Sequence, residues 1–269
     1  MKKRIDILLV EKNFFDSRQK AQTAIMSGIV KVNEKVVDKV GTLIKETDII
    51  TFKEALEEKY VSRGGFKLEK AINIFNPKLE NKIFLDVGAS TGGFTDCLLQ
   101  NKAKLVYAID VGYGQLDWKI RSNPNVKVLE RINARHLKQE ELYKENEEKA
   151  DACVMDVSFI SITKIIPNLI ELLKEDFFII ALIKPQFEAG KENLKKGVVT
   201  SSDIHIKVIE DVNNFLNSLS LYINQLTFSP IKGPSGNIEF LAFISKNSEN
   251  IIDNQLIKQI VLDSKNQLD

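Results

Sequence analysis

From Ser62 to the end of the chain, apolar runs of strand length alternate with stretches of helical periodicity. The pattern predicts strands at residues 83–87, 105–110, 126–129, 151–156, 177–183, 221–228 and 238–245, and helices at residues 66–75, 93–101, 137–148, 161–174 and 203–219. Such alternation is typical of a mostly parallel sheet with helices on both faces. The last two strands are joined by a short loop, residues 231–237, instead of a helix, so we expect them to be antiparallel.

Residues 1–53 follow a different pattern and are expected to form a small α+β unit. Two helices are predicted first. The second, capped by Asp16 or Ser17, should end at Gly28, where a left-handed conformation suits glycine. Beyond Gly28 the apolar positions alternate, which predicts short strands around a turn at Asn33-Glu34 and a further strand near its end.

A charged and weakly patterned stretch at residues 53–59 separates these two patterns. It has no regular apolar period and is expected to act as a linker. We therefore expect two domains in the 269 residues: a small domain with its linker at residues 1–58, and an α/β domain at residues 59–269.

Composition narrows the class of protein. Hydrophobic residues make up 43% and charged residues 28% of the chain, which excludes wholesale disorder and a membrane-embedded bundle. The longest apolar run, residues 177–183, has the length of a strand, so no transmembrane helix is expected; the N-terminus lacks the features of a signal peptide. We expect a cytoplasmic protein with Cys97 and Cys153 as reduced thiols. No metal site is expected, because His136 and His205 lie far apart in the sequence.

The strongest local signal is a small-residue loop between a predicted strand and a predicted helix. The strand ends at Asp86, and glycines follow at Gly88, Gly92 and Gly93, a spacing that differs from the dinucleotide fingerprint G-x-G-x-x-G. An acidic residue here suits a ligand with a positive centre, such as the sulfonium of S-adenosylmethionine. Asp110, at the end of the next strand, is placed to bind two ribose hydroxyls. The alternative is an ordinary strand-to-helix turn with two solvated aspartates.

Four further charged residues lie near the predicted strand ends. Asp156 and Lys184 follow strands, Glu239 begins the last strand, and Lys67 lies upstream of the first. The carboxyl ends of parallel strands form the ligand crevice in open α/β sheets, so we expect Asp156, Lys184 and Glu239 at one edge. This set suits deprotonation of a weakly acidic hydroxyl, with Lys184 near Lys67 as general base. The alternative is that each residue is a solvated charge at a strand end.

These motifs, in this order, resemble the TlyA family of haemolysin A-type ribosomal RNA ribose 2′-O-methyltransferases. The first 53 residues are similar to an S4 RNA-binding domain, notably in Arg4-Ile5-Asp6, and the remainder resembles an FtsJ-type methyltransferase. The resemblance implies a Rossmann-like sheet that binds S-adenosylmethionine, and a catalytic tetrad of Lys67, Asp156, Lys184 and Glu239. We expect eight residues to contact the cofactor: Asp86, Gly88, Ser90, Gly92, Gly93, Phe94, Asp110 and Asn133.

A basic N-terminal unit agrees with an RNA substrate. Residues 1–45 hold ten Lys or Arg and five Asp or Glu, in a chain whose net charge is +1. Such residues contact phosphates without reading sequence. For any single lysine, a solvated surface position is the alternative. We expect RNA contacts from six residues: Arg4, Lys12, Arg18, Lys20, Lys31 and Arg63.

The resemblance implies methylation of a cytidine ribose 2′-hydroxyl in 16S rRNA, 23S rRNA or both, with ribosomal subunits as partners and neither a membrane nor an obligate protein partner. Family members that modify one subunit are expected to act on the small one. The near-full N-terminal domain and the tail at residues 251–269 favour both subunits here. Three other functions stay open: a non-catalytic ribosome-assembly factor, a membrane-active haemolysin, and a nicotinamide oxidoreductase, which the glycine spacing disfavours.

Overall fold

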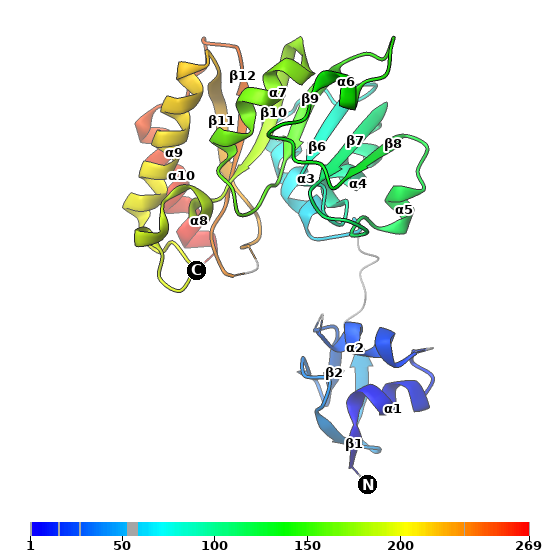
Figure 1. Cartoon of the computed structure of the whole chain (residues 1–269). Helices are drawn as coiled ribbons and strands as arrows, with labels where there is room; N and C mark the ends of the chain where they lie inside the picture. Colours follow the sequence, from blue (N-terminus) through cyan, green and yellow to red (C-terminus); the bar gives the residue numbers. More distant parts are fainter. Residues whose placement is uncertain (1, 16, 27, 53–58, 234, 269) are drawn as a thin grey trace. The chain divides into compact units, whose positions relative to one another are not determined.

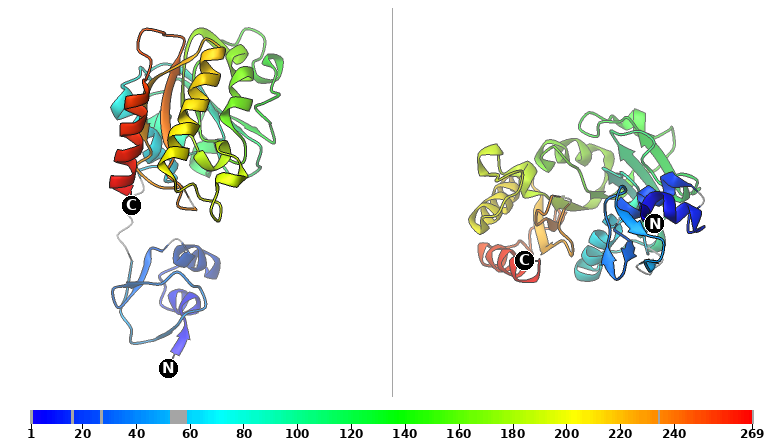
Figure 2. Two further views of the ribbon diagram at one scale, coloured as in Figure 1. Left: turned by 90° about the vertical axis from the view of Figure 1, so that its left-hand side faces the viewer. Right: turned by 90° about the horizontal axis from the view of Figure 1, so that it is seen from below.

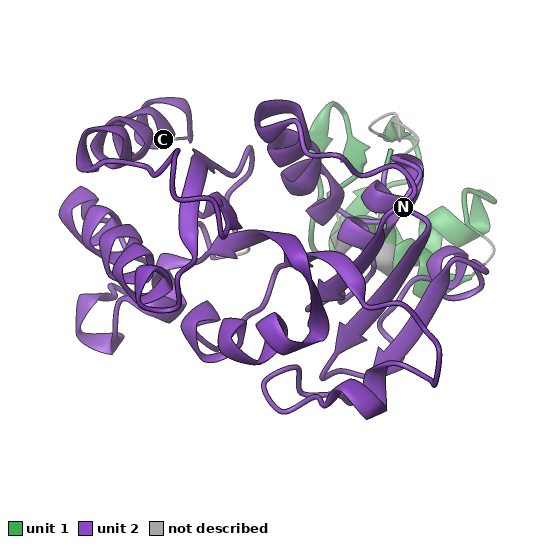
Figure 3. Ribbon diagram, turned by 90° about the horizontal axis from the view of Figure 1, so that it is seen from above, with its two compact units in different colours: residues 1–59 green, residues 60–269 purple. Residues whose placement is uncertain are grey.

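The structure is a computed structural model that describes residues 2–15, 17–26, 28–52, 59–233 and 235–268. The chain divides into two compact units, residues 1–59 and residues 60–269 (Figure 3). Each unit has its own buried apolar core, so each is described by itself.

The described residues of the first unit form two short helices and two small antiparallel sheets. β2 pairs with both β3 and β5, and β1 pairs with β4. The helices pack on each other over a core that includes Ile5, Leu9 and Ile25. The elements are β1 (Lys2–Arg4), α1 (Ile5–Glu11), α2 (Arg18–Met26), β2 (Val30–Val32), β3 (Lys35–Val36), β4 (Leu43–Lys45) and β5 (Ile50–Phe52).

The small α+β unit confirms the sequence pattern in most details. The Ser17 hydroxyl accepts a hydrogen bond from the backbone of Lys20 at 3.3 Å, so Ser17 caps α2 as predicted, whereas Asp16 lies outside the described residues. Gly28 has a φ of 72°, and the turn residues Asn33 and Glu34 also have positive φ. The strands β1 and β4 were not predicted, because the charged segment of β1 has no apolar alternation and is ordered by its partner.

The second unit is built on a seven-stranded sheet in the order β11-β12-β10-β9-β6-β7-β8 (Figures 1 and 2). Strands β6 to β10 are parallel, and β12 runs antiparallel to both neighbours, as predicted. The strands are β6 (Ile83–Val87), β7 (Leu105–Asp110), β8 (Val126–Glu130), β9 (Ala150–Met155), β10 (Leu173–Ile183), β11 (Tyr222–Phe228) and β12 (Phe240–Ser245).

Helices cover both faces of this sheet. On one face, α3 and α4 pack over residues such as Phe84 and Leu182; on the other, α7 and α9 pack over residues such as Leu85 and Ile183. α10 lies against α9 and β11. The helices are α3 (Gly64–Phe75), α4 (Gly93–Gln100), α5 (Trp118–Arg121), α6 (Gln139–Leu142), α7 (Ile166–Leu172), α8 (Pro185–Glu188), α9 (Ser202–Ser218) and α10 (Asn254–Leu268), with 3-10 turns η1 (Ile162–Lys164) and η2 (Lys191–Asn193).

Two helix predictions and the start of one strand need correction. The helix expected at residues 137–148 is only the four residues of α6. The chain leaves the helix at Tyr143, whose hydroxyl donates to the carbonyl of Leu172 at 2.6 Å and accepts from the amide of Ala150 at 3.0 Å. The helix expected at 161–174 divides into η1 and α7, and β10 begins earlier than predicted, at Leu173. These departures follow from tertiary contacts that local periodicity does not record.

The C-terminal tail is a further difference. Most of it is the helix α10, which buries Ile257 and Val261 against the core of the second unit. Its sequence is mainly polar, so its helical character was not predicted. Burial of one apolar stripe explains why the segment is ordered.

Candidate active site

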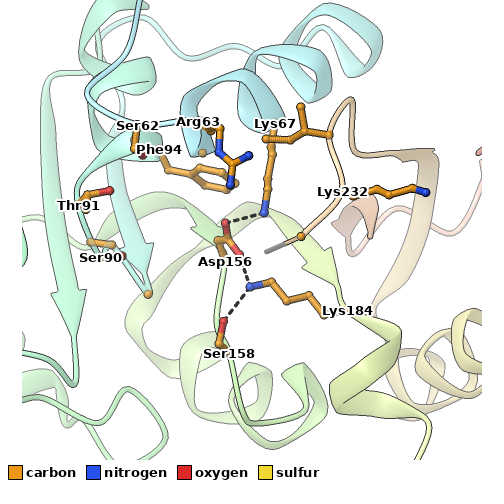
Figure 4. A pocket seen from close by; sticks show the side chains of 16 residues that line it. Ser62, Arg63, Lys67, Ser90, Thr91, Phe94, Asp156, Ser158, Lys184 and Lys232 are labelled. Carbon is orange, nitrogen blue, oxygen red and sulfur yellow. Dashed lines mark hydrogen bonds and ion pairs between the residues drawn. The ribbon is translucent and has the colours of Figure 1, made fainter. Parts of the chain in front are cut away.

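The charged residues predicted at strand ends meet at the carboxyl edge of the parallel strands. Asp156 follows β9, Lys184 follows β10, and Glu239 immediately precedes the antiparallel strand β12. Lys67 comes from the first turns of α3. Four residues spread over most of the second unit are therefore brought into one cluster, and Figure 4 shows three of them facing one another.

Ion pairs connect the members of this cluster in a chain. Lys67 Nζ lies 2.7 Å from Glu239 Oε2 and 3.3 Å from Asp156 Oδ2. Lys184 Nζ lies 2.6 Å from Asp156 Oδ1 and donates to the hydroxyl of Ser158 at 2.9 Å. Glu239, Lys67 and Lys184 are buried, so this is not a set of solvated surface charges. Burial without these partners would be costly for each charge, which makes the cluster one interdependent unit.

The two lysines differ in their surroundings. Burial lowers the pKa of Lys67, but the carboxylates of Asp156 and Glu239 raise it by more, so this pKa is above its ordinary value. Lys67 is thus held as a cation. Lys184 has one carboxylate partner and one hydroxyl partner. The two lysines therefore share the carboxylate of Asp156 but differ in their second partner.

Gly88 brings the loop after β6 against the loop after β9. Its φ is 84°, and a Cβ at this position would lie 2.7 Å from the carbonyl oxygen of Asp156. Only glycine fits this close approach. The close approach sets the distance between the glycine loop and the charged cluster.

Two adjoining cavities open at this edge. The larger, about 550 Å³, is lined by Asp110, Asn133 and Phe159 among others; the smaller, about 280 Å³, is lined by Arg63, Lys67, Phe94, Asp156, Lys184 and Lys232. Both include Gly88, Ser90 and Ser158 in their linings. The larger volume lies within the usual range for small-molecule sites. A ligand in the larger cavity would therefore reach toward the charged cluster in the smaller one.

Asp110 shapes the wall of the larger cavity. Its carboxylate accepts hydrogen bonds from the amides of Ser90 at 2.8 Å and Gly112 at 2.6 Å. These bonds tie the glycine loop to the loop after β7. Asp110 is therefore oriented at the position where the sequence predicts a ribose contact.

Asp86 lies beneath the loop instead of in a cavity. It is fully buried, lines neither cavity, and accepts a hydrogen bond from the Thr95 hydroxyl at 2.5 Å. Gly92 also lines neither cavity; the space beside its Cα is filled by Leu116 and Ile120. Both residues support the loop, and their direct contact with the cofactor stays a prediction, whereas Gly93 and Phe94 line the smaller cavity.

We predict that Asp86→Asn weakens the pH dependence of stability. Burial, with smaller contributions from Asp156 and Asp110, outweighs the Thr95 hydrogen bond and raises the pKa of Asp86 to about 7. Because this pKa lies above that of the unfolded chain, the contribution is fully present at low pH and is lost as pH rises through about 7. The wild type should lose roughly 4 kcal/mol more than the variant between pH 4 and pH 8.

Urea unfolding at a series of pH values checks this. Asp176→Asn, at an exposed position in β10, is the matched control and should keep the wild-type profile. Equal slopes for wild type and Asp86→Asn would show that Asp86 is ionised throughout this range.

The predicted RNA contacts fall into two groups. Arg63 lines the smaller cavity of the second unit, where Figure 4 shows its guanidinium above Asp156. The other five belong to the first unit: Arg4 and Arg18 bind Asp6, Lys12 donates to the carbonyl of Glu46, Lys31 lies 3.9 Å from Glu34, and Lys20 lies in α2.

Several residues of the site were not singled out from the sequence. Ser158 accepts a hydrogen bond from Lys184, and the Gln186 amide donates to Glu239 Oε1 at 3.3 Å. Phe159 lines the larger cavity, is 92% exposed, and has a φ of 66° with its ring 5.2 Å from that of Phe187. Each lies within three residues after Asp156 or Lys184, so extending those two motifs along the chain would have found them all.

No group of three His, Cys, Asp or Glu residues suited to a metal ion occurs among the described residues. His205 is buried against the ring of Phe240. Both cysteines are buried in the core of the second unit.

Comparison with known families agrees with this geometry. Residues 60–246 match the FtsJ-like methyltransferase family, and residues 3–50 match the S4 domain. The chain belongs to the FtsJ-like methyltransferase family. The family match contains all four residues of the charged cluster and the residues that line both cavities.

Individual relatives match most of the length of this FtsJ-like methyltransferase. The 16S/23S rRNA (cytidine-2′-O)-methyltransferase TlyA of Mycobacterium tuberculosis is 36% identical, over 93% of this chain and 92% of the relative. The 23S rRNA (cytidine-2′-O)-methyltransferase TlyA of Campylobacter jejuni is 36% identical, over 72% and 74%. A solved structure of a candidate hemolysin from Streptococcus thermophilus has 42% identity and a TM-score of 0.77, over 99% and 96%. The predicted resemblance to the TlyA family is confirmed.

The hemolysin name of some relatives raises the question of membrane insertion. No helix among the described residues of this chain is long and apolar enough to span a bilayer.

Proposed function

We propose that this methyltransferase transfers a methyl group from S-adenosylmethionine to the ribose 2′-hydroxyl of a cytidine in ribosomal RNA. The observation that supports it best is the buried Lys67–Asp156–Lys184–Glu239 cluster beside the glycine loop. Such a cluster suits proton removal from a weakly acidic hydroxyl. The S4 domain and the names of the TlyA relatives support RNA as the carrier of that hydroxyl.

The residues present fit S-adenosylmethionine. Gly88 permits close approach of a ligand, Asp110 is oriented for ribose hydroxyls, and Asn133 lines the same cavity on the side expected for adenine. Asp110 and Asp156, which line the cavities beside Gly88, give these surroundings a negative character that suits a sulfonium and an ammonium group. The same carboxylates would repel the pyrophosphate of a nicotinamide dinucleotide, which argues against the oxidoreductase alternative.

The reaction needs a nucleophilic oxygen aligned with the sulfonium methyl. S-adenosylmethionine supplies that methyl as an electrophile. Lys184, in its neutral form, takes the proton of the 2′-hydroxyl as the new carbon–oxygen bond forms and the carbon–sulfur bond breaks. Asp156 holds Lys184 in position, and Lys67, kept cationic by Glu239 and Asp156, stabilises the developing negative charge on oxygen.

The subunit specificity is also a proposal. The C. jejuni relative is named for one rRNA, the 23S rRNA of the large subunit. The expectation that family members modifying one subunit act on the small subunit was therefore wrong for that relative. The M. tuberculosis relative, whose match covers 93% of this chain, is named for both rRNAs. We therefore propose that this chain modifies both subunits.

Methyl transfer to separated ribosomal subunits tests the function. Subunits from a strain that lacks this gene are incubated with protein and tritiated S-adenosylmethionine, and the RNA is digested for nucleoside mass spectrometry. We expect label as 2′-O-methylcytidine from both subunits. Label on a base would contradict the proposed mechanism. Cofactor binding without any transfer to subunits or naked rRNA would favour a non-catalytic assembly factor.

A further inference from the structure

The first unit contains a fully buried carboxylate at the centre of a polar network. Asp6 lies in the first turn of α1, and its side chain has no exposed area. It accepts four hydrogen bonds: from Arg4 Nε at 3.0 Å and Arg4 Nη2 at 3.1 Å, from Arg18 Nε at 2.9 Å, and from Gln22 Nε2 at 2.9 Å. The donors come from the last residue of β1 and from α2, and Asp6 itself belongs to α1, so one carboxylate connects both helices.

The two arginines on this carboxylate are themselves exposed. The side chain of Arg4 is 42% exposed and that of Arg18 is 54% exposed, whereas the Asp6 side chain that they bind is 0% exposed. A guanidinium has five N–H donors in a rigid fork, more than Asp6 accepts from either residue. The network therefore presents two oriented positive groups at one place on the surface of the unit.

Asp6 remains charged at any working pH. Arg4 chiefly lowers its pKa, with further contributions from Gln22 and Arg18 that together outweigh burial. The carboxylate thus binds the arginines by charge as well as by hydrogen bonds, and charge-assisted bonds of this kind are the stronger ones.

We propose that Asp6 is a positioning residue for RNA binding, which holds Arg4 and Arg18 as one preformed pair that takes a backbone phosphate. This inference rests on the proposed function and deepens it. Long side chains lose rotamer freedom when they bind, and a pair already fixed by Asp6 avoids part of that cost. The planar forks also suit the geometry of phosphate oxygens.

The direction in which one substitution changes RNA affinity distinguishes positioning by Asp6 from electrostatic attraction alone. Asp6→Asn removes a negative charge from an RNA-binding surface, so electrostatics alone predicts tighter binding. Positioning predicts the opposite, because the neutral amide no longer holds both guanidinium groups. We expect the Kd for an rRNA fragment to rise about tenfold. The slope of log K against log salt should become shallower by about one for each phosphate that the variant no longer neutralises.

Catalysis provides a second readout in the full chain. With ribosomal subunits as substrate, Asp6→Asn should raise KM in parallel with Kd and leave kcat within about twofold, because the charged cluster belongs to the other unit. Glu46→Gln is the matched control. It removes one carboxylate from an exposed pair with Lys3 in the same unit and should bind equally or more tightly.

A second variant covers the case in which Asp6→Asn unfolds the first unit, which an amide NMR spectrum would reveal. The double variant Arg4→Lys, Arg18→Lys keeps the net charge and the possibility of ion pairs with Asp6, but not the planar fork. It should weaken binding as Asp6→Asn does. Unchanged or tighter binding by a folded variant of either kind overturns the proposal. Because binding is measured apart from methylation, a protein that binds RNA without methylating it contradicts only the proposed function.

Discussion

Lys184→Met is expected to lower kcat for methyl transfer by about 10² to 10⁴, the usual range for loss of a general base. The variant lacks the amine that takes the 2′-hydroxyl proton in the proposed mechanism. Lys184→Arg should be equally inactive, although it places a positive charge beside Asp156, because a guanidinium does not give up its proton in proteins. The two variants thus distinguish a Lys184 that acts as a general base from a Lys184 that acts only through its positive charge.

Single-turnover methylation with saturating cofactor is the measurement, accompanied by calorimetric binding of S-adenosylmethionine and by RNA binding. Both binding steps should stay within a few-fold of the wild type. Lys207→Met, at an exposed position on α9, is the control and should be fully active. Activity of Lys184→Arg within tenfold of wild type would show that Lys184 acts as a cation, and would move the search for the base elsewhere.

Gly88→Ala is expected to weaken S-adenosylmethionine binding more than tenfold and to lower the melting temperature by several degrees. An alanine here must adopt a positive φ, and its Cβ meets the Asp156 carbonyl at 2.7 Å. The backbone strain alone costs about 1–3 kcal/mol. Relief of the clash must separate the glycine loop from the loop that carries Asp156, which disrupts both cavities.

Gly114→Ala distinguishes the effect of backbone strain from the effect of the clash with Asp156. Gly114 has a φ of 69°, but a Cβ there meets no atom within 4 Å. This control carries the strain of positive φ without the clash, so it should lose some stability and keep cofactor affinity. Calorimetry for binding and differential scanning calorimetry for stability measure both variants. Equal cofactor affinity in the two variants would show that the close approach at Gly88 is not required for the site.

Much of the site could be predicted because parallel strands have a fixed polarity. Asp156 and Lys184 directly follow apolar runs that the sequence marks as strands, and the carboxyl ends of such strands meet at one edge. The loop between β11 and β12 is too short for a crossover, which places Glu239 at the same edge. These conclusions require only local periodicity and the geometry of a sheet.

Side-chain direction at the site could not be predicted in this way. Asp86 lies one residue before the end of β6 and Asp110 ends the neighbouring strand β7, so the two look similar in sequence. Asp86 is buried on Thr95, however, whereas Asp110 lines the larger cavity. The difference depends on what α4 places beneath the loop. The ion pair of Lys67 with Glu239 joins residues 172 positions apart, and no local pattern contains such a contact.

The sequence by itself determined the two kinds of unit, the strands of the large sheet, the glycine loop and the types of charge at the sheet edge, because each depends on local backbone periods and turn chemistry. The tertiary structure decided the short α6 at Tyr143, the helical C-terminus and the network in which Asp6 holds two arginines. Each of these is stabilised by groups distant in the sequence. Their free energy comes from burial and hydrogen bonds that exist only once the chain has folded.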